Sequence, residues 1–270
     1  MQVQTNPLSL KVIRALYSAQ RDMSTAAERI STHLRINSAA DDPGGLMVAD
    51  RIKTEIQSVS AANQGVHTGL GATQVVDQAL SAMSDVLGNM YALSSNPGTM
   101  SSLDYGQAMS DYLAEIDQIT SGATYNGKSL MSADQSITLA SGDHAPAPLS
   151  LKKTDMTWLG LVASDIQDLG QAGTGPGKSG TTIDTAINKV NSYQAQIGAQ
   201  INVLNHHQDY LNGLSTQYSQ SYGRIMNADL ALEASNLASA QVRRDGATAM
   251  LAQANGINKD LVAYLLKSLN

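Results

Sequence analysis

The chain has 270 residues, 42% of them hydrophobic, and a net charge of −6 from 17 Lys and Arg against 23 Asp and Glu. Its hydrophobic content excludes wholesale disorder, and the absence of cysteine excludes disulfides, thiolate metal sites and cysteine nucleophiles. The acidic balance argues against nucleic acid as the main partner, and no apolar stretch reaches the ~20 residues that span a membrane. Because the chain has no Phe and one Trp, its core must be largely aliphatic, which favours helix-on-helix packing.

Apolar residues in the first segment recur in steps of three and four, which predicts an amphipathic helix with a heptad seam. The members of this seam are Val12, Leu16, Ala19, Met23, Ala26 and Ile30. Asp41, Asp42 and Pro43 predict the start of a second helix, since acidic caps and a proline favour a first helical turn. A similar seam continues to the Asn96-Pro97-Gly98 turn, so this helix would span about 50 residues, or roughly 75 Å at ~1.5 Å per residue.

The next segments predict a shorter helix and then a change to strands. Ser101 and Asp104 fit a capping box, and apolar residues repeat at helical spacing up to Ile119. Residues 136–140 and 149–152 alternate between apolar and polar, which predicts a small β-hairpin near residues 134–165. A glycine-rich stretch at residues 170–180 predicts a flexible connection.

The strongest periodicity in the chain follows this stretch. Thr181 and Asp184 are expected to cap a helix whose heptad seam continues from Ile183 to Ile225. An alanine-rich amphipathic segment follows at residues 228–254, and Gly256 is expected to break it before a final leucine-rich stretch. The predicted fold is therefore mainly α: a long antiparallel helical bundle or coiled coil with a small β-hairpin element.

One stretch fits a catalytic motif. Residues 172–179 match a permissive phosphate-binding loop in which Lys178 would reach the terminal phosphate. The preceding residues are polar, whereas such a loop follows a buried strand, and glycine-rich linkers produce this match by accident. The five histidines show no metal-ligand spacing. We therefore predict no catalytic, cofactor or metal site, and keep a nucleotide-binding enzyme acting through Lys178 as a remote alternative.

Two signatures near the ends of the chain resemble those of bacterial flagellins. The first is ERISTHLRINSAADDPGGL at residues 28–46, and the second comprises GRIMNADLALE at 223–233 and ATAMLAQAN at 247–255. Tyr125, Asn126 and Gly127, with Leu130, match the family's aromatic-Asn-Gly element. The resemblance covers essentially the whole chain, at the length of a flagellin without the variable outer domains. A hook–filament junction-type axial protein is the runner-up, because its terminal helices are related.

The resemblance implies a structural subunit, not an enzyme, that self-assembles into the helical filament used for bacterial motility. It implies an inner-core coiled-coil domain of residues 1–44 plus 227–270 and an outer-core rod domain of residues 45–226. The residues expected to pack the inner core and support polymerisation are Leu16, Met23, Ile30, Leu34, Leu237, Leu251, Leu261 and Leu265. The implied location is extracellular. The implied partners are other copies of the chain, an export chaperone and the export apparatus, and hook-associated and cap proteins, without nucleic acid or membrane insertion.

Two further expectations accompany the resemblance. The terminal helix pair is short and buries little area, so we expect residues 1–40 and 227–270 to fold on assembly. The family's Gln-Arg-x-Arg motif, which a vertebrate innate immune receptor recognises, is replaced here by Gly88, Asn89, Met90 and Tyr91. We expect weak or absent activation of that receptor.

Overall fold

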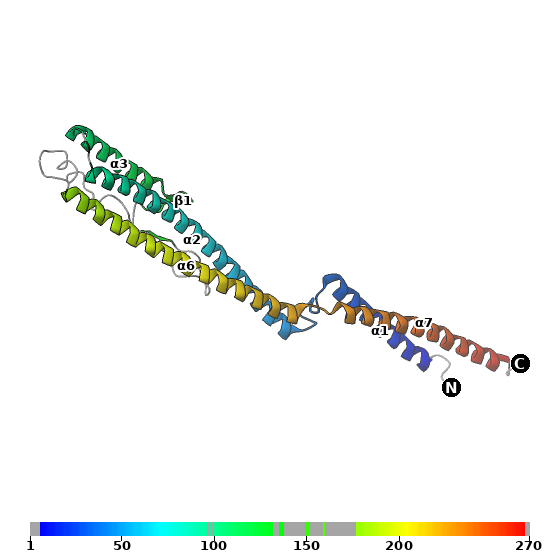
Figure 1. The fold of residues 1–270 in the computed structure, drawn as a ribbon. Coiled ribbons are helices and arrows are strands. Elements are labelled where there is room, and N and C mark those ends of the chain that lie inside the picture. The colour runs from blue at the N-terminus through cyan, green and yellow to red at the C-terminus, as the bar shows by residue number, and fades with distance from the viewer. Residues whose placement is uncertain are drawn as a thin grey trace. The chain divides into compact units, whose positions relative to one another are not determined.

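A computed structural model describes residues 6–96, 98, 100–131, 135–137, 149–151, 159 and 177–267. This part of the chain forms five α-helices and two small antiparallel sheets of two strands each (Figure 1). The helices are α1 (Pro7–Thr32), α2 (Pro43–Ser95), α3 (Ser102–Gly122), α6 (Gly177–Met226) and α7 (Leu230–Lys267). The predicted mainly α fold with a β-hairpin element is confirmed.

The chain divides into two compact units, and the division falls within α2 and α6. Unit 1 comprises Met1–Thr54 and Tyr218–Asn270, and it contains α1 and α7. Unit 2 comprises Glu55–Gln217, and it contains α3, the strands and most of α2 and α6. The division into residues 1–44 plus 227–270 and residues 45–226 stays a prediction.

Helices α1, α2 and α3 begin at side chains that cap the first helical turn. The Asn6 side chain accepts hydrogen bonds from the backbone N–H groups of the first turn of α1, which opens with a proline. Asp42 precedes α2 and accepts a 2.9 Å bond from the Gly45 N–H, so the predicted start at Pro43 is confirmed. Ser101 caps α3 by accepting from the Asp104 N–H, as the capping box predicts.

Two predicted helix boundaries are wrong. Helix α6 begins at Gly177, so Thr181 and Asp184 lie inside it and do not cap it. The last residues of the predicted glycine-rich connection, 177–180, are therefore helical, and residues 170–176 lie outside the described ones. Helix α7 continues through Gly256 without a break. In both places glycine costs only ~1 kcal/mol relative to alanine, which a long, packed helix tolerates.

Helices α2 and α6 lie side by side and antiparallel in unit 2. Three polar side-chain contacts join them: Asn63 to Asn212 at 3.0 Å, His67 to Gln208 at 3.2 Å, and Asp77 to Gln194 at 3.4 Å. The partners ascend along α2 as they descend along α6, which establishes the antiparallel direction.

The core of unit 2 is aliphatic, as the composition predicts. Most of its fully buried side chains come from α2, α3 and α6, and they include Val66, Leu80, Leu87, Met109, Ile116, Val190 and Ile197. Leu130, Met131 and Leu159 join them from the segments that follow α3. Tyr193 is the one aromatic residue among the largest fully buried side chains of the described residues. The seams recognised in the sequence therefore face the core of this unit.

Two short hairpins follow α3. Strands β1 (Thr124–Tyr125) and β2 (Lys128–Ser129) pair across Asn126 and Gly127, whose φ angles of 50° and 74° are those of a type I′ turn. This hairpin was not predicted, although Asn-Gly is a strong hairpin signal. Strands β3 (Gln135–Ile137) and β4 (Leu149–Leu151) pair antiparallel, which confirms the predicted hairpin.

The β1–β2 hairpin contacts α2 at a glycine. A Cβ atom at Gly71 would lie 2.9 Å from the Tyr125 hydroxyl oxygen, whereas a Cβ at Gly88 on the same helix would meet nothing within 4 Å. We expect Gly88→Ala to raise the free energy of unfolding by ~0.5–1 kcal/mol through helix propensity. Gly71→Ala should be less stable than Gly88→Ala by about 1–2 kcal/mol because the ring must move. Urea unfolding followed by circular dichroism measures the difference, and equal stability of the two variants would contradict it.

Candidate assembly surface on the terminal helices

Helices α1 and α7 pack antiparallel along their length (Figure 1). Near the start of α1, the Asn6 side-chain amide donates to the Ala254 carbonyl oxygen at 3.1 Å, and the Ser9 hydroxyl donates to Asn255 Oδ1 at 3.2 Å. Near its end, Arg29 Nη1 lies 3.0 Å from Glu233 Oε1. The first turn of α1 therefore meets the C-terminal half of α7, and its last turn meets the start of α7.

The seam between the two helices consists mostly of alanine. Most of its buried residues recur every seven positions: Val12, Ala19 and Ala26 on α1, and Glu233, Ala240, Ala247 and Ala254 on α7. Ser9, near the start of α1, is also buried. Alanine side chains allow the helix axes to approach closely. Accordingly, Cα atoms of the two helices lie within 8 Å of each other at many positions.

The larger residues that the sequence places in this core lie beside the alanine seam or, for Leu34, in the segment that follows α1. They are half-buried in the single chain: Leu16, Met23, Ile30, Leu34, Leu237 and Leu251. Leu261 and Leu265 lie in α7, but their side chains are outside the described ones. All eight residues therefore belong to unit 1, six of them with half-buried side chains, and their role in polymerisation stays a prediction.

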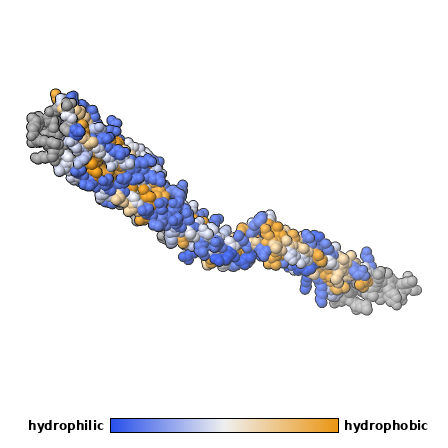
Figure 2. All heavy atoms as spheres, viewed as in Figure 1, coloured by the Kyte–Doolittle hydropathy of each residue, from blue (hydrophilic) through white to orange (hydrophobic). Residues whose placement is uncertain are grey.

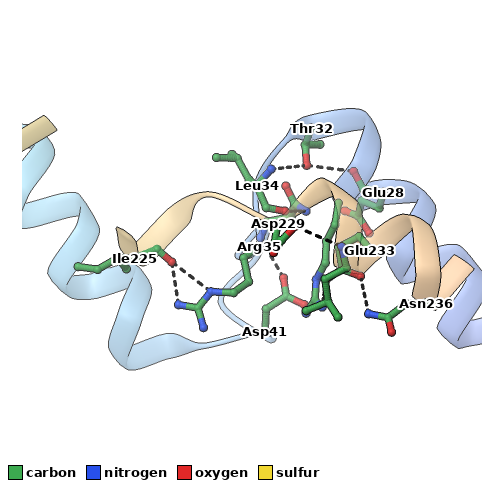
Figure 3. Close-up of polar contacts among 12 residues, drawn as sticks. Glu28, Thr32, Leu34, Arg35, Asp41, Ile225, Asp229, Glu233 and Asn236 are labelled. Carbon is green, nitrogen blue, oxygen red and sulfur yellow. Dashed lines mark hydrogen bonds and ion pairs between the residues drawn. The ribbon is translucent and has the colours of Figure 1, made fainter. Parts of the chain in front are cut away.

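A partly buried ion pair, in which the Arg29 side chain is 28% exposed, closes one end of the seam. The Glu233 side chain is 8% exposed, and its second carboxylate oxygen accepts a 3.2 Å bond from the Asn236 side-chain amide (Figure 3). A second ion pair between the helices, Asp22 with Arg243 at 2.9 Å, is exposed to solvent. Nothing in the heptad pattern predicted either pair, because the partners are about 200 residues apart in sequence and neither helix reveals the other's register.

The segments that join the terminal helices to the rest of unit 1 are bonded to each other. Leu34 and Asn227 form an isolated antiparallel bridge, with the Arg35 N–H donating to the Met226 carbonyl at 2.6 Å. The Arg35 guanidinium donates two further bonds to the Ile225 carbonyl, at 2.8 and 3.3 Å (Figure 3). We call this set of contacts the linker bridge.

A small apolar cluster accompanies the linker bridge. Ile36, Ala49 and Met226 are buried together, and the partly buried Leu34, Leu46, Tyr222 and Ile225 pack against them. This cluster holds the segment between α1 and α2 against the start of α2 and the end of α6. It also explains why the connection contains the apolar residues Leu34 and Ile36.

Asp41 organises the turn that follows. Its carboxylate accepts bonds from the Ser38 and Asn37 N–H groups, at 2.9 and 3.1 Å, and from the Ser38 hydroxyl. These bonds, led by the one from the Ser38 backbone, hold the pKa of Asp41 below its ordinary value of 3.8.

The lowered pKa has a consequence for acid stability. The ionised carboxylate stabilises the native turn, so its contribution is complete above the ordinary pKa of 3.8 and is lost as the pH falls through the lowered native pKa. We expect Asp41→Asn to remove this contribution at neutral pH and to flatten the dependence of stability on pH below ~4. Thermal unfolding between pH 2 and pH 7 tests this, with Asp50→Asn, an exposed carboxylate on α2, as the control. An unchanged acid profile in Asp41→Asn would contradict it.

Exposed apolar side chains concentrate on unit 1. Of the fifteen large apolar residues exposed in the described part of the chain, ten belong to unit 1, which is the smaller of the two. Eight of the ten lie on the terminal helices: Leu8, Leu10, Tyr17, Leu230, Leu232, Val242, Met250 and Ile257. Figure 2 shows apolar residues among polar ones on this helix pair, gathered mainly near the end of α1 and the start of α7. Such concentrations mark surfaces that bind other proteins.

The remaining predictions concern chemistry. Within the described residues, no helix is long and apolar enough to cross a membrane, and no group of three His, Asp or Glu side chains converges as a metal site. The Lys178 side chain and residues 172–176 of the possible phosphate-binding loop lie outside the described ones. Neither the nucleotide-binding alternative nor the junction-protein alternative gains support.

Comparison with known proteins extends these observations to the whole chain. The sequence model of the bacterial flagellin N-terminal helical region matches residues 3–136, and that of the C-terminal helical region matches residues 181–265. The flagellin of Listeria innocua is 30% identical over 279 residues, covering 94% of this chain and 96% of that protein. The flagellar filament 33 kDa core protein of Treponema phagedenis is 28% identical over 270 residues, covering 92% of each.

Two further comparisons concern length and fold. The match to the flagellin of Salmonella montevideo covers 73% of this chain but 41% of that protein, as expected for a short form. The fold is similar to a putative flagellar hook-associated protein from Vibrio parahaemolyticus, with a TM-score of 0.58, 14% identity, and coverage of 69% of this chain and 100% of that one. At this identity the likeness shows the fold alone. The chain belongs to the bacterial flagellins, in a short form without the variable outer domains, and is a structural subunit of the extracellular flagellar filament.

Proposed function

We propose that the exposed apolar face of the α1–α7 pair is the surface through which this flagellin packs against other copies of itself in the filament. The observation that carries the proposal is the concentration of exposed apolar residues on these two helices. On α1, Leu10 and Tyr17 are seven residues apart, and on α7, Met250 and Ile257 are also seven apart, so each pair lies on one face of its helix. The alanine seam forms the contact between the two helices, so these exposed residues remain available to pack against a neighbouring copy of the chain.

The occupant of this surface is a second copy of the chain, because flagellins are homopolymers. A contact between two different surfaces of identical subunits forms a closed ring only if repeating the rotation between neighbouring subunits brings the last subunit back to the first. Repetition of such a contact therefore generates a helical filament. The half-buried inner-core residues, including Leu16, Met23, Leu237 and Leu251, would complete their burial in this contact.

The composition of the seam supports the proposal that the terminal segments fold on assembly. An alanine side chain buries much less apolar area than leucine, so the seam alone supplies little stability against the cost of ordering two helices. Additional burial against neighbouring copies would supply the remainder. Coupled folding of this kind gives a strong dependence of helix content on assembly.

Truncation tests the assembly surface. Deleting residues 261–270, which contain Leu261 and Leu265, should leave unit 2 folded but stop polymerisation, because the terminal helix pair loses apolar residues needed between copies. Seeded polymerisation followed by electron microscopy measures assembly, and circular dichroism of the monomer checks the fold. Filaments of normal diameter and stability from the truncated chain would refute the proposal.

The remaining partners follow from the place of a flagellin in its assembly. We include an export chaperone, the export apparatus, and the hook-associated and cap proteins as partners of this chain, and no enzymatic activity. The absence of cysteine supports passage in an unfolded state, because no disulfide would have to form or break. Membership in a structural protein family supports the absence of catalysis.

A further inference from the structure

The alanine seam does not by itself determine the register of α1 against α7. On α7 the buried residues recur at intervals of seven and three of the four are alanine, and on α1 the buried Val12, Ala19 and Ala26 have the same spacing. Moving α7 by seven residues, or ~10.5 Å at ~1.5 Å per residue, would place alanine where alanine lay before. The seam therefore sets how closely the helices approach, and other contacts must select one register.

Glu233 is the exception in this series. It occupies the heptad position that Ala240, Ala247 and Ala254 occupy further along α7, and its side chain is 8% exposed. Arg29 Nη1 lies 3.0 Å from one carboxylate oxygen. The Asn236 amide lies 3.2 Å from the other (Figure 3). In a register shifted by seven residues, Glu233 would lose Arg29. A buried charge without its partner is strongly unfavourable.

We propose that Arg29 and Glu233 are positioning residues that select the register of the α1–α7 pair. A buried polar contact in a mostly apolar seam is an established way of fixing register in coiled coils. The linker bridge holds the same end of the pair, with Arg35 and Met226 bonded through their backbone atoms. Every residue offers such backbone groups, so those bonds cannot distinguish one register from the next, whereas a side-chain ion pair can. The Ser9–Asn255 bond at the other end of the pair joins two neutral side chains, so its loss costs less than leaving a buried carboxylate without its partner.

The selected register determines which exposed residues lie at the same level along the pair. With Ser9 opposite Asn255, the exposed Leu10 of α1 lies level with the part of α7 that carries Ile257. A shift by one heptad would displace the exposed residues of one helix by ~10.5 Å along the other. The inference concerns the helix pair itself and not the surface that meets a neighbouring copy. Because the pair is expected to fold on assembly, its register is measured in seeded filaments.

The absence of cysteine allows a direct measurement of register. In the full-length chain, Ser9→Cys with Asn255→Cys joins positions whose side-chain oxygens lie 3.2 Å apart, and reports the observed register. Ser9→Cys with Thr248→Cys reports a shift by seven residues, because Thr248 lies two helical turns before Asn255 on the same face. Mild oxidation and non-reducing electrophoresis, with peptide mass analysis, give the yield of each intramolecular crosslink.

The unmodified background should favour the 9–255 crosslink over the 9–248 crosslink by about tenfold or more. Arg29→Glu should lower this ratio by about tenfold or more, and the exchange of Arg29→Glu with Glu233→Arg should restore it to within about threefold. The matched control is Arg243→Glu, which makes the same charge reversal in the exposed Asp22–Arg243 pair. It should leave the ratio within about twofold, because exposed pairs contribute little.

Three results would overturn the inference. The first is an unchanged ratio in Arg29→Glu, and the second is an equal loss in the Arg243→Glu control. The third is loss of both crosslinks in Arg29→Glu without recovery in the exchanged variant. That result would show that the pair holds the helices together and does not choose between registers.

Discussion

Ala240→Leu is expected to raise the critical concentration for filament assembly by roughly ten- to a hundredfold. Ala240 is completely buried in the seam, where Cα atoms of α1 and α7 lie within 8 Å of each other. A leucine there cannot be accommodated without separating the helices, and overpacking of this kind costs ~1–3 kcal/mol, with ~1.4 kcal/mol corresponding to a tenfold change. Sedimentation of seeded filaments at increasing subunit concentration measures the effect.

The matched control is Ala238→Leu, two residues away on the exposed side of α7. The substitution has the same chemistry and a similar effect on helix propensity, so it separates overpacking of the seam from a general effect of leucine. We expect near-normal assembly from Ala238→Leu. Equal defects in the two variants would mean that the alanine seam is not what brings the helices together.

The combination of Met250→Glu with Ile257→Glu is expected to abolish filament assembly and to leave the monomer folded. Both side chains are more than half exposed in the single chain, at 57% and 54%, so replacing them removes little internal packing. If they pack against a neighbouring copy, two carboxylates would be buried without partners at every contact, at a cost of several kcal/mol for each ion. Electron microscopy after seeding measures assembly, and circular dichroism measures the fold of the monomer.

An apolar control isolates the role of the surface. Met250→Leu with Ile257→Leu preserves the apolar character and nearly the volume of both positions, so filaments should still form. Normal filaments from the glutamate variant would place the contact between copies elsewhere on the chain. Failure of the leucine variant to assemble would indicate a requirement for particular side-chain shapes and not for apolar burial alone.

The seam of α1 illustrates how far the sequence alone could reach. The steps of three and four correctly predicted the helix and the face that it buries, because periodicity depends only on helix geometry. They could not show that Val12, Ala19 and Ala26 lie deepest while Leu16 and Met23 stay half-buried. That distinction depends on the alanines of α7, which determine where the two backbones approach most closely.

The hairpins and helix boundaries also show which features the local sequence predicts and which features depend on the folded chain. Alternation predicted the β3–β4 pairing because it is a property of neighbouring residues. The start of α6 at Gly177 and the continuity of α7 through Gly256 went against local breaker signals. A glycine contributes only ~1 kcal/mol to such a signal, so the stability of the helix as a whole outweighs it.

By itself, the sequence determined what local chemistry and the order of residues can determine. This includes the caps at Asp42 and Ser101, the heptad faces, the aliphatic core and, through two ordered terminal signatures, the flagellin family. Only the tertiary structure decided that Arg29 meets Glu233 and that Arg35 meets the Ile225 carbonyl. Each of these contacts joins residues about 200 positions apart, and heptad-spaced alanines allow several registers of equal local quality. The choice among them depends on which long-range polar partners meet, and that is a property of the folded chain.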